Sequence, residues 1–546
     1  MNTPTDQQRV LYFSNSAGIW AHGISDALLL NRLRQMGCLV STISCDGFQQ
    51  SLCHTKESRG RTLGGWIASS KLDCLDCKFS SALISIAGDV RGVHNYWLGK
   101  HISISARQEV EALMTDWEKA GYPIELEYQG VPVAKLAAYE ASLKFKSWDE
   151  GTKGKGKAQF QATVRDVALA AVAARSFFSS CEKWPTVIIR APHYSINGAF
   201  AYVAQAFGSR VIFVDGSQNL TEDYTHLMFW DWSKYRSGNP AKQYFEKVGS
   251  PEASELKRIE KHFQVLRKSR SHKIYSPAQR STGSSLEALG ALPDRPTALL
   301  AVSSVDEAVT SKLADVNPNI NYPGEVYVDQ HEWVQRTIHW FARNENFQLV
   351  IRLHPREFPN RREGYSSAAG RRWERDLVNL PKNVFVDHPD KKLSLYDLLE
   401  EVSVVVTGWS SVGLEALESG KPLIIYDQTL PAYPATLGLT GGTEDEYFSN
   451  LQFALEGNAR FVDSNLLLKW LHLTMNIGSS RIGGRFLASR RSSMSRVWSL
   501  LLEGLDRYLF FIYRPLDLIR GVLFEKSDKK FKSVIIDGKN NLYDSL

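Results

Sequence analysis

The chain of 546 residues lacks several features that mark specialised classes of protein. Its six cysteines are too few for a disulfide framework. No apolar run reaches the roughly 18 residues that span a bilayer, and the polar start MNTPTDQQRV carries no secretory signal. We therefore expect a cytoplasmic protein with reduced thiols. The 43% apolar and 23% charged residues exclude a wholly disordered, collagen-like or coiled-coil chain.

Charge of one sign is also scarce. The 65 Lys and Arg residues exceed the 59 Asp and Glu residues by only six, which gives a net charge of +6. Spread over this length, the excess suits anionic ligands or an acidic membrane surface and does not by itself indicate nucleic acid. The length predicts two or three domains.

Short β-rich runs alternate with helical periodicity in the first half, which is typical of an α/β domain. The predicted strands are 10–13, 39–43, 186–190 and 211–214, and the predicted helices include 104–118, 131–146, 160–178 and 196–207. The Lys- and Gly-rich run 151–157 predicts an exposed loop.

A second α/β series follows the polar stretch 265–296, where we place a domain boundary. Its strands are nearly continuous apolar runs, as in parallel strands covered on both faces. They are predicted at 297–302, 347–353, 383–387, 403–407 and 422–427, with a helix over 328–343. We predict α/β domains over 1–280 and 290–480 and a C-terminal helical extension over 481–546.

Ligands of open parallel sheets bind beyond the carboxyl ends of the strands. In the second half those ends carry a set of polar residues and one proline. They are Ser303, Ser304, Arg352, His354, Pro355, Thr407, Ser410, Ser411 and, one helical turn further on, Glu415. Each alone has an ordinary structural interpretation as a helix cap or turn. Together they favour a nucleotide or phosphate site.

The chemistry of such a site follows from the residue types. The hydroxyls of Ser410 and Ser411, with the free N–H groups of a helix start, form an anion site. His354 donates to the same phosphate, and Pro355 stiffens the turn that presents it. Arg352 adds positive charge, and Glu415 accepts hydrogen bonds from a ribose diol.

The segments IRLHPRE and SLYDLLEEVSVVVTGWSSVGLEALESGKPLI resemble the nucleotide-binding half of bacterial capsule and surface-polysaccharide glycosyltransferases of GT-B fold. Transferases of Kdo, sialic acid and polyol phosphate share the His-Pro and Ser-Ser features. The resemblance is specific over about 297–430 and weak in the N-terminal half. It implies two Rossmann-like domains facing across a cleft, with C-terminal helices.

In that family the His-Pro histidine and the hydroxyl pair bind the phosphate of a nucleotide-activated donor, often CMP-linked. The matching residues are His354 and Ser410 with Ser411, and Glu415 would bind ribose. The family also uses an acidic base or nucleophile from the N-terminal domain, for which the match is poor. The candidates are Asp215, His22, Asp26, Asp46 and, from the facing domain, Glu307. No metal is required for catalysis if the donor carries a single phosphate.

Four cysteines form a separate group in the N-terminal region. Cys74 and Cys77 have the C-x-x-C spacing of metal sites, and Cys45 and Cys53 precede them. A structural zinc site is one interpretation, and ordinary reduced cysteines are the other.

The stretch 496–525 is rich in aromatic residues and arginines and is divided by Pro515. Its all-round hydrophobicity favours a helix packed across the domains. The alternative is a membrane-surface element that would place the protein at the inner membrane, beside a lipid-linked acceptor.

The sequence thus predicts a glycosyltransferase that moves a sugar from a nucleotide-activated donor onto a bacterial surface polysaccharide or glycolipid. One alternative is a polyol-phosphate transferase or sugar-nucleotide epimerase of the same fold. The other is a non-catalytic nucleotide- or glycan-binding assembly protein. A carboxylate or histidine from residues 1–260 facing His354 would distinguish an enzyme from the binding protein.

Overall fold

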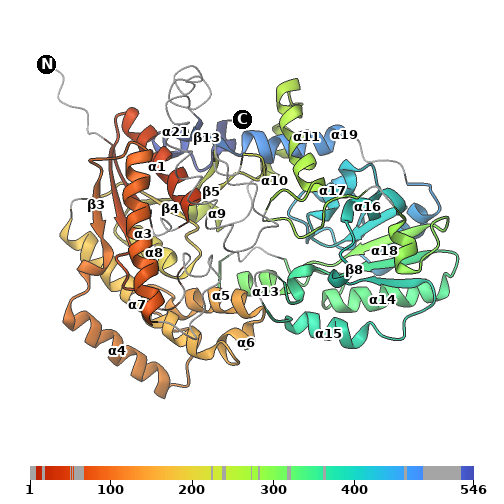
Figure 1. Cartoon of the computed structure of the whole chain (residues 1–546), viewed down its shortest axis with the longest axis horizontal. Coiled ribbons are helices and arrows are strands. Elements are labelled where there is room, and N and C mark those ends of the chain that lie inside the picture. The colour runs from red at the N-terminus through yellow and green to blue at the C-terminus, as the bar shows by residue number, and fades with distance from the viewer. Residues whose placement is uncertain are drawn as a thin grey trace.

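The computed structural model describes residues 8–14, 19–49, 51, 53, 67–181, 183–222, 225–236, 241–271, 273–280, 283–316, 321–360, 364–459, 464–483 and 530–545. Two α/β domains lie side by side, the first on the left of Figure 1 and the second on the right. The stretch 496–525 lies outside the described residues. In the part of the chain that the structure describes, no helix is long and apolar enough to cross a membrane.

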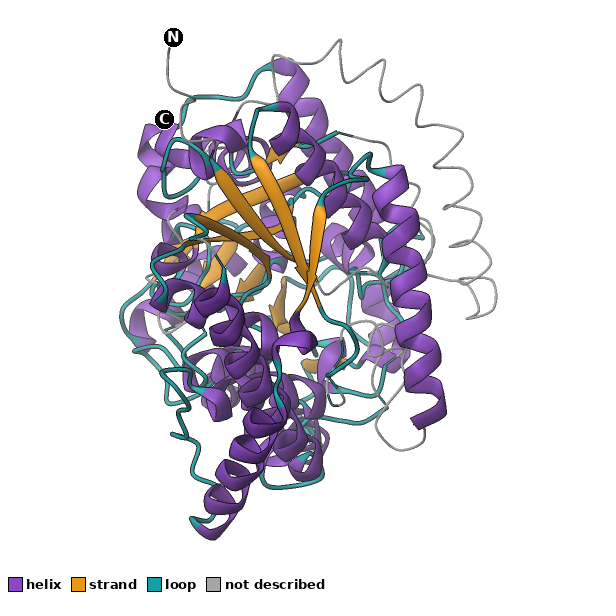
Figure 2. Ribbon diagram, turned by 90° about the vertical axis from the view of Figure 1, so that its left-hand side faces the viewer, coloured by secondary structure: helices purple, strands orange, loops and turns teal. Residues whose placement is uncertain are grey.

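The first domain is built on a seven-stranded sheet in the order β13-β6-β5-β4-β1-β2-β3, which Figure 2 shows as a twisted fan between helices. The strands are β1 (Arg9–Ser14), β2 (Leu39–Ser44), β3 (His94–Trp97), β4 (Thr186–Arg190), β5 (Arg210–Gly216), β6 (His226–Asp231) and β13 (Ser480–Arg481). Strands β1 to β5 are parallel, and β6 and β13 are antiparallel to their neighbours. The chain starts at β1 and extends the sheet first on one side and then on the other. The strand order therefore reverses between β1 and β4, as in Rossmann folds.

Alternate side chains of β1 explain the two helical layers on this sheet. Leu11 and Phe13 belong to one apolar cluster, and Val10 and Tyr12 belong to another on the opposite face. The first cluster includes α4 (Ile104–Lys119), α5 (Val133–Phe145), α7 (Lys157–Ser180) and α8 (Ser195–Ala206). The second includes α1 (Trp20–Gln35), α3 (Ile67–Ala87) and α21 (Lys530–Ile535).

The run 151–157 is only in part the exposed loop that its composition predicted. Its first residues belong to α6 (Trp148–Thr152), and Gly151 is buried. A Cβ on Gly151 would come within 2.7 Å of the backbone of Ser142 on α5. The glycine therefore serves close packing of two helices, and only residues 153–155 form an exposed turn.

The second domain has a six-stranded parallel sheet in the order β12-β11-β10-β7-β8-β9. The strands are β7 (Thr297–Ala301), β8 (Gln348–Arg352), β9 (Val384–Asp387), β10 (Val404–Thr407), β11 (Leu423–Ile425) and β12 (Leu439–Thr440). Here the strand order reverses between β7 and β10. Two Rossmann-like domains confirm the predicted α/β, GT-B fold class.

Helices cover both faces of this sheet for the same reason as in the first domain. Ala298 and Leu300 of β7 pack with α14 (Gln330–Arg343) and α18 (Glu444–Leu455), whereas Leu299 packs with α16 (Leu395–Glu401) and α17 (Val412–Glu418). Two further helices of the domain are α13 (Val305–Leu313) and α15 (Ala368–Asp376).

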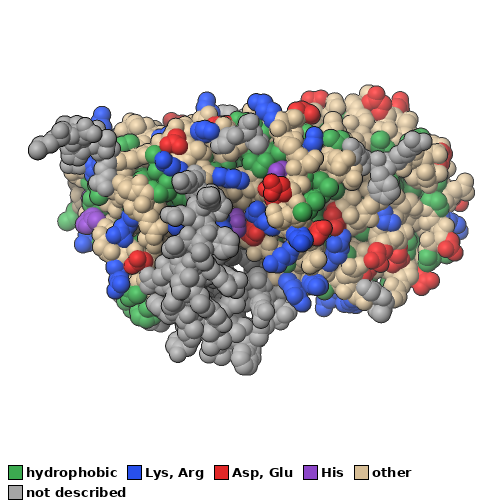
Figure 3. Space-filling view, turned by 90° about the horizontal axis from the view of Figure 1, so that it is seen from above, with side chains coloured by type: hydrophobic (Ala, Val, Ile, Leu, Met, Phe, Trp, Pro, Cys, Tyr) green, Lys and Arg blue, Asp and Glu red, His purple; other side chains and the backbone are tan. Residues whose placement is uncertain are grey.

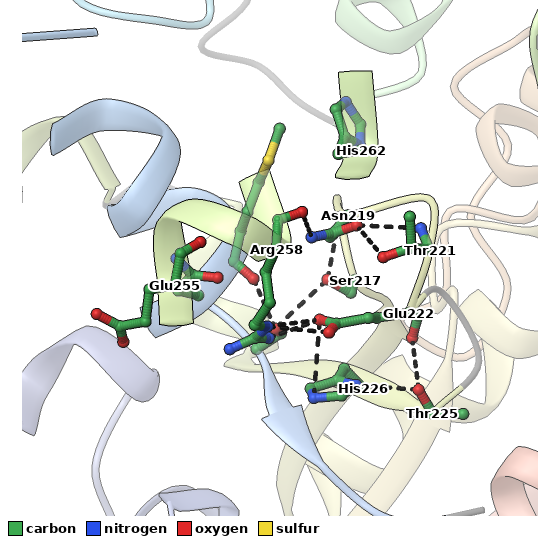
Figure 4. A network of polar contacts seen from close by, with 12 residues as sticks. Ser217, Asn219, Thr221, Glu222, Thr225, His226, Glu255, Arg258 and His262 are labelled. Atoms are coloured by element: carbon green, nitrogen blue, oxygen red, sulfur yellow. Dashed lines mark hydrogen bonds and ion pairs between the residues drawn. The ribbon is translucent and has the colours of Figure 1, made fainter. Parts of the chain in front are cut away.

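Two of the described segments cross between the domains, and Figure 4 shows the polar contacts around the first of them. The first crossing includes α11 (Ala253–Arg267); the return runs through α19 (Ser464–Leu471) and the π-helix η7 (His472–Ile477) to β13. Arg258 on α11 forms a bidentate ion pair with Glu222, with contacts of 2.5 and 2.9 Å. His472 lies 3.6 Å from Glu255 on α11. Because β13 joins the first sheet, the end of the predicted second domain belongs structurally to the first.

Candidate functional site

The loops that carry the predicted donor-binding residues are neighbours, because β7 lies between β8 and β10. The register pairs the last residue of β7 with the last residues of both neighbours. The loops after β8 and β10 therefore leave the sheet on either side of the loop after β7. The fold therefore brings His354, Ser303 and Ser410 to one edge, where the strand order reverses.

His354 is a hydrogen-bond donor held in one tautomer. Its Nδ1 accepts the N–H of Arg356 at 3.2 Å, which places the ring proton on Nε2. Among the described residues, nothing hydrogen-bonds to that Nε2. The pKa of His354 is lowered to about 4, chiefly by burial. The positive charges of Arg356, Arg352 and Lys146 also lower it, and the negative charge of Asp306 raises it. The ring is therefore neutral at pH 7 and offers one N–H to a ligand.

The two serines after β7 differ in what their hydroxyls do. The backbone of Ser303 exchanges two hydrogen bonds with the Gln330 side chain, at 2.7 and 3.0 Å. Its Oγ is buried and has no hydrogen-bond partner among the described residues. The Oγ of Ser304, by contrast, donates to Asp306 at 2.5 Å. Ser303 thus offers a hydroxyl to a ligand, and Ser304 braces the start of α13.

The loop after β10 is built to hold Ser410 and Ser411 in place. The Ser410 Oγ accepts the N–H of Val412 at 3.3 Å, and the Ser410 carbonyl accepts the Tyr433 hydroxyl at 3.3 Å. Ser411 is exposed, and its side chain makes no capping bond to α17. Thr407 is buried and donates to the carbonyl at the end of β7 at 3.0 Å, so it joins the two strands rather than facing solvent.

Glu415 and Arg352 complete the predicted set. Burial raises the pKa of Glu415 to about 7, and the Tyr396 hydroxyl on α16 donates to its carboxylate. Arg352 lies close enough to lower the pKa of both Glu415 and His354. It is not a loose cation, because it forms an ion pair with buried Asp387 at the end of β9.

The sequence suggested Arg356 as a further positive charge at this site but did not predict that the charges behind the His354 turn are buried. Arg356 is 8% exposed and pairs with Asp306 at 2.9 Å. Glu357 is fully buried, accepts the Val305 N–H at 3.1 Å and accepts a hydrogen bond from Ser367. A charged turn at a strand end is ordinarily solvated, so nothing in the sequence pointed to this burial.

A second His-Pro turn was also missed, although the repeated dipeptide was a usable signal. His388-Pro389 follows β9 as His354-Pro355 follows β8, and each opens a short 3₁₀ helix. The Nδ1 of His388 accepts the N–H of Asp390 at 3.3 Å. The turn therefore copies the geometry at His354 one strand further from the reversal point.

Of the candidate bases, Asp26 is tied into the first domain. It forms an ion pair with Arg190 at 2.6 Å, and both side chains are buried. Arg190, the last residue of β4, also donates to Ser25 at 3.2 Å. His22 lies one turn before Asp26 on α1 and is half-buried.

Asp215 and Glu307 lie around one tyrosine in the region between the domains. Burial raises the pKa of Tyr194, and the nearby carboxylates of Glu140, Asp215 and Glu307 raise it further. Asp215 is the penultimate residue of the first domain's β5, and its Oδ1 accepts the N–H of Gly216 at 2.7 Å. Glu307 belongs to the second domain, is exposed and lies 3.3 Å from Arg356. Groups from both domains thus meet at Tyr194.

His193 stands beside this tyrosine and was not predicted. Its ring centroid lies 4.5 Å from that of Tyr194 and 5.7 Å from that of Tyr139. The turn after β4 that presents His193 includes Ala191 at φ +47°, a conformation that favours glycine. The available signal was a histidine just beyond a strand end in the first domain.

Three of the four N-terminal cysteines, Cys45, Cys53 and Cys74, lie in the same region. The Gly47 N–H donates to the Cys45 Sγ at 3.3 Å, and a Cβ on Gly47 would be 3.2 Å from the Cys74 Sγ. Burial raises the pKa of the Cys45 thiol to about 12, with a further contribution from Cys53. No three metal-binding side chains of the described residues are placed to hold an ion. The zinc hypothesis for these cysteines and Cys77 stays a prediction, which metal analysis of gently purified protein tests.

Both signs of charge are mixed on the described surface seen in Figure 3.

No family model matches the chain, and the search of curated proteins found no match. Solved structures give weak likenesses. The β-Kdo 2,4- and 2,7-transferases of Thermosulfurimonas dismutans KpsC align at 16% and 13% identity, with TM-scores of 0.31 and 0.32. The alignments cover 52% and 61% of this chain and 78% and 89% of theirs.

A third likeness is to the UDP-GlcNAc 2-epimerase of Neisseria meningitidis bound to UDP-GlcNAc. It aligns at 8% identity and a TM-score of 0.28, over 86% of this chain and 97% of the epimerase. With identities and TM-scores this low, none of these likenesses indicates what this chain binds. Function is therefore inferred from the residues of the site.

Proposed function

We propose that the chain is a glycosyltransferase that takes a sugar from a nucleotide-activated donor, with a CMP-linked sugar as the first candidate. Its acceptor is a growing bacterial surface polysaccharide or glycolipid. The observation that carries the proposal is the neutral imidazole of His354, whose Nδ1 is occupied by Arg356 and whose Nε2–H is directed by that bond. The motif resemblance over 297–430 supports the same assignment.

The donor phosphate binds at the reversal point of the second sheet. There the His354 Nε2–H and the Ser303 hydroxyl donate to its oxygens, and the exposed hydroxyl of Ser411 adds a further donor. Because the His354 ring is neutral and held in place, it keeps its proton and its hydrogen bond to the phosphate when negative charge develops on the leaving nucleotide. Glu415 lies on α17 in reach of the ribose, where its carboxylate accepts hydrogen bonds from the diol.

The acceptor hydroxyl approaches from the first domain, and we assign Asp215 as its base. Asp215 lies near the carboxyl end of β5, is close to Tyr194 and, within the described residues, forms no ion pair. It takes the acceptor proton as the sugar is transferred. In a retaining enzyme its carboxylate would instead attack the sugar and form a covalent intermediate. Asp26 is less suited because Arg190 holds it in a buried pair.

The proposal is tested by nucleotide binding. We expect CMP, in a panel with UDP, GDP and CDP, to stabilise the native protein by about 2.7 kcal/mol at a hundred times its Kd. The change His354→Ala should weaken CMP binding about 10- to 100-fold, because one hydrogen bond to a charged group is lost. His388→Ala is the matched control, since it removes the same ring from the same kind of turn.

Three outcomes separate the candidate functions. If no nucleotide raises the melting temperature, or if both histidine variants bind alike, the donor site is wrong. If Asp215→Asn binds CMP normally but transfers nothing, the glycosyltransferase assignment stands. If the native protein binds nucleotide and turns over no activated sugar, the non-catalytic binding protein replaces the enzyme.

A further inference from the structure

The end of helix α5 in the first domain docks onto the loop that presents His354 in the second. Arg356 donates through Nη2 to the carbonyl of Leu143 at 2.9 Å. In the opposite direction, the Lys146 Nζ donates to the carbonyls of Phe358 and Tyr365, each at 2.9 Å. The loop that begins at His354 is therefore hydrogen-bonded to the other domain from both sides.

The backbone at Lys146 indicates that its side chain is needed there. Lys146 follows the last residue of α5 with φ +53°, a left-handed conformation for which glycine is the usual choice. The side chain is nevertheless 1% exposed, so a lysine occupies a strained position and is also buried. Strain of this kind is kept where the surrounding structure requires the residue. The ring of neighbouring Phe145 stacks on Tyr365 at 5.8 Å and supports the same contact.

The charge of Lys146 reaches the histidine as well as the loop. Four charged groups act on His354: Arg352 from β8, Arg356 from its own turn, Asp306 from α13 and Lys146 from α5. The ring of Tyr275 packs against it at 5.7 Å. Of the four charges, only Lys146 comes from the first domain. Its contribution to the field at His354 therefore depends on contact between the domains.

We propose that Lys146 is a positioning residue of the donor site, which holds the His354 loop from the opposite domain and adds positive charge beside it. The site is complete only while the domains are in contact at α5. This inference rests on the proposed role of His354 in binding the donor. It predicts that donor binding and closure of the two domains are coupled.

The test uses the full chain with CMP as the probe and three variants. Lys146→Met removes the charge. Lys146→Gly removes it too but relieves the left-handed backbone, so it guards against a variant that fails to fold. Lys135→Met is the matched control, because Lys135 also lies on α5 and also bridges the domains, through a 2.5 Å ion pair with Asp315 that is more exposed.

We expect both Lys146 variants to weaken CMP binding about tenfold and Lys135→Met to leave it unchanged. The second readout is the titration of the His354 ring, followed by NMR of labelled histidines and assigned with His354→Gln. Loss of the nearby cation should move the pKa of His354 upward in both Lys146 variants and not in Lys135→Met. A residue that only stabilised the interface would not move it.

Two results would overturn the inference. One is CMP binding by the Lys146 variants equal to that of Lys135→Met. The other is an unchanged titration of His354. If the native chain binds no nucleotide, the proposed function fails by itself, and the titration alone decides whether Lys146 acts on His354.

Discussion

Glu357 carries the sharpest quantitative prediction, because its carboxyl group is fully buried behind the His354 turn. Its pKa is raised from 4.5 to about 7, mainly by burial and in addition by the negative charge of Asp306. The hydrogen bonds from Ser367 and Val305 and the positive charge of Arg356 oppose this rise. A raised pKa means that the folded state holds the proton more tightly than the unfolded state. The stability that Glu357 contributes is therefore fully present below pH 4.5 and is lost as the pH rises through about 7.

The magnitude follows from that rise. At 1.36 kcal/mol for each pKa unit, a change from 4.5 to about 7 corresponds to about 3 kcal/mol of unfolding free energy. Glu357→Gln keeps the size of the side chain and removes the titration. The variant should therefore gain up to about 3 kcal/mol relative to the native chain between pH 4.5 and pH 8.

The assay is urea unfolding at pH 5, 6.5 and 8, followed by tryptophan fluorescence. The effect should appear in the transition of the second domain, since the two domains need not unfold together. Glu374→Gln, on the exposed face of α15, controls for the loss of one negative charge. If the gap between Glu357→Gln and the native chain is the same at pH 5 and pH 8, the buried carboxyl group does not titrate as argued.

Two further predictions concern buried carboxylates. The pKa of Glu415 is raised to about 7, so binding of CMP through its ionised form should strengthen about tenfold from pH 6 to pH 8. Calorimetry should find that dependence absent in Glu415→Gln, and equal pH profiles would remove Glu415 from the ribose site. Arg190→Met leaves Asp26 buried without its 2.6 Å partner and should lower the unfolding free energy by about 3–5 kcal/mol. Adding Asp26→Asn should recover much of it; a cost below about 1 kcal/mol for the single variant would contradict a tightly coupled pair.

The sequence predicted those parts of the fold that depend on local pattern. Continuous apolar runs located β7, β8 and β10, because strands of a parallel sheet are buried on both faces whatever their order. The helix predicted over 328–343 spans Gln330–Arg343, because the Asp329 side chain caps its start by accepting the Glu332 N–H at 2.7 Å. The strands β6 and β13, which extend the first sheet by antiparallel pairing, were missed.

The candidate site was predictable to the extent that its residues follow strand ends. His354, Ser303 and Ser410 were predicted to share one edge because residues beyond parallel strands meet there. The hydroxyls of Ser410, Thr407 and Ser304, however, form hydrogen bonds to the protein itself, whereas that of Ser303 does not. Residue type and position are alike in both groups, so only the hydrogen bonds separate them.

The amino-acid sequence by itself determined which segments become strands and which polar residues end them, because both depend on side-chain pattern within a few residues. The tertiary structure alone decided the strand order, the burial that keeps His354 neutral, and the contacts of Lys146 and Arg356 across the domains. Those two contacts join groups more than two hundred residues apart in the sequence. A buried ammonium or guanidinium looks like any surface charge until the chain has brought its partner carbonyl to it.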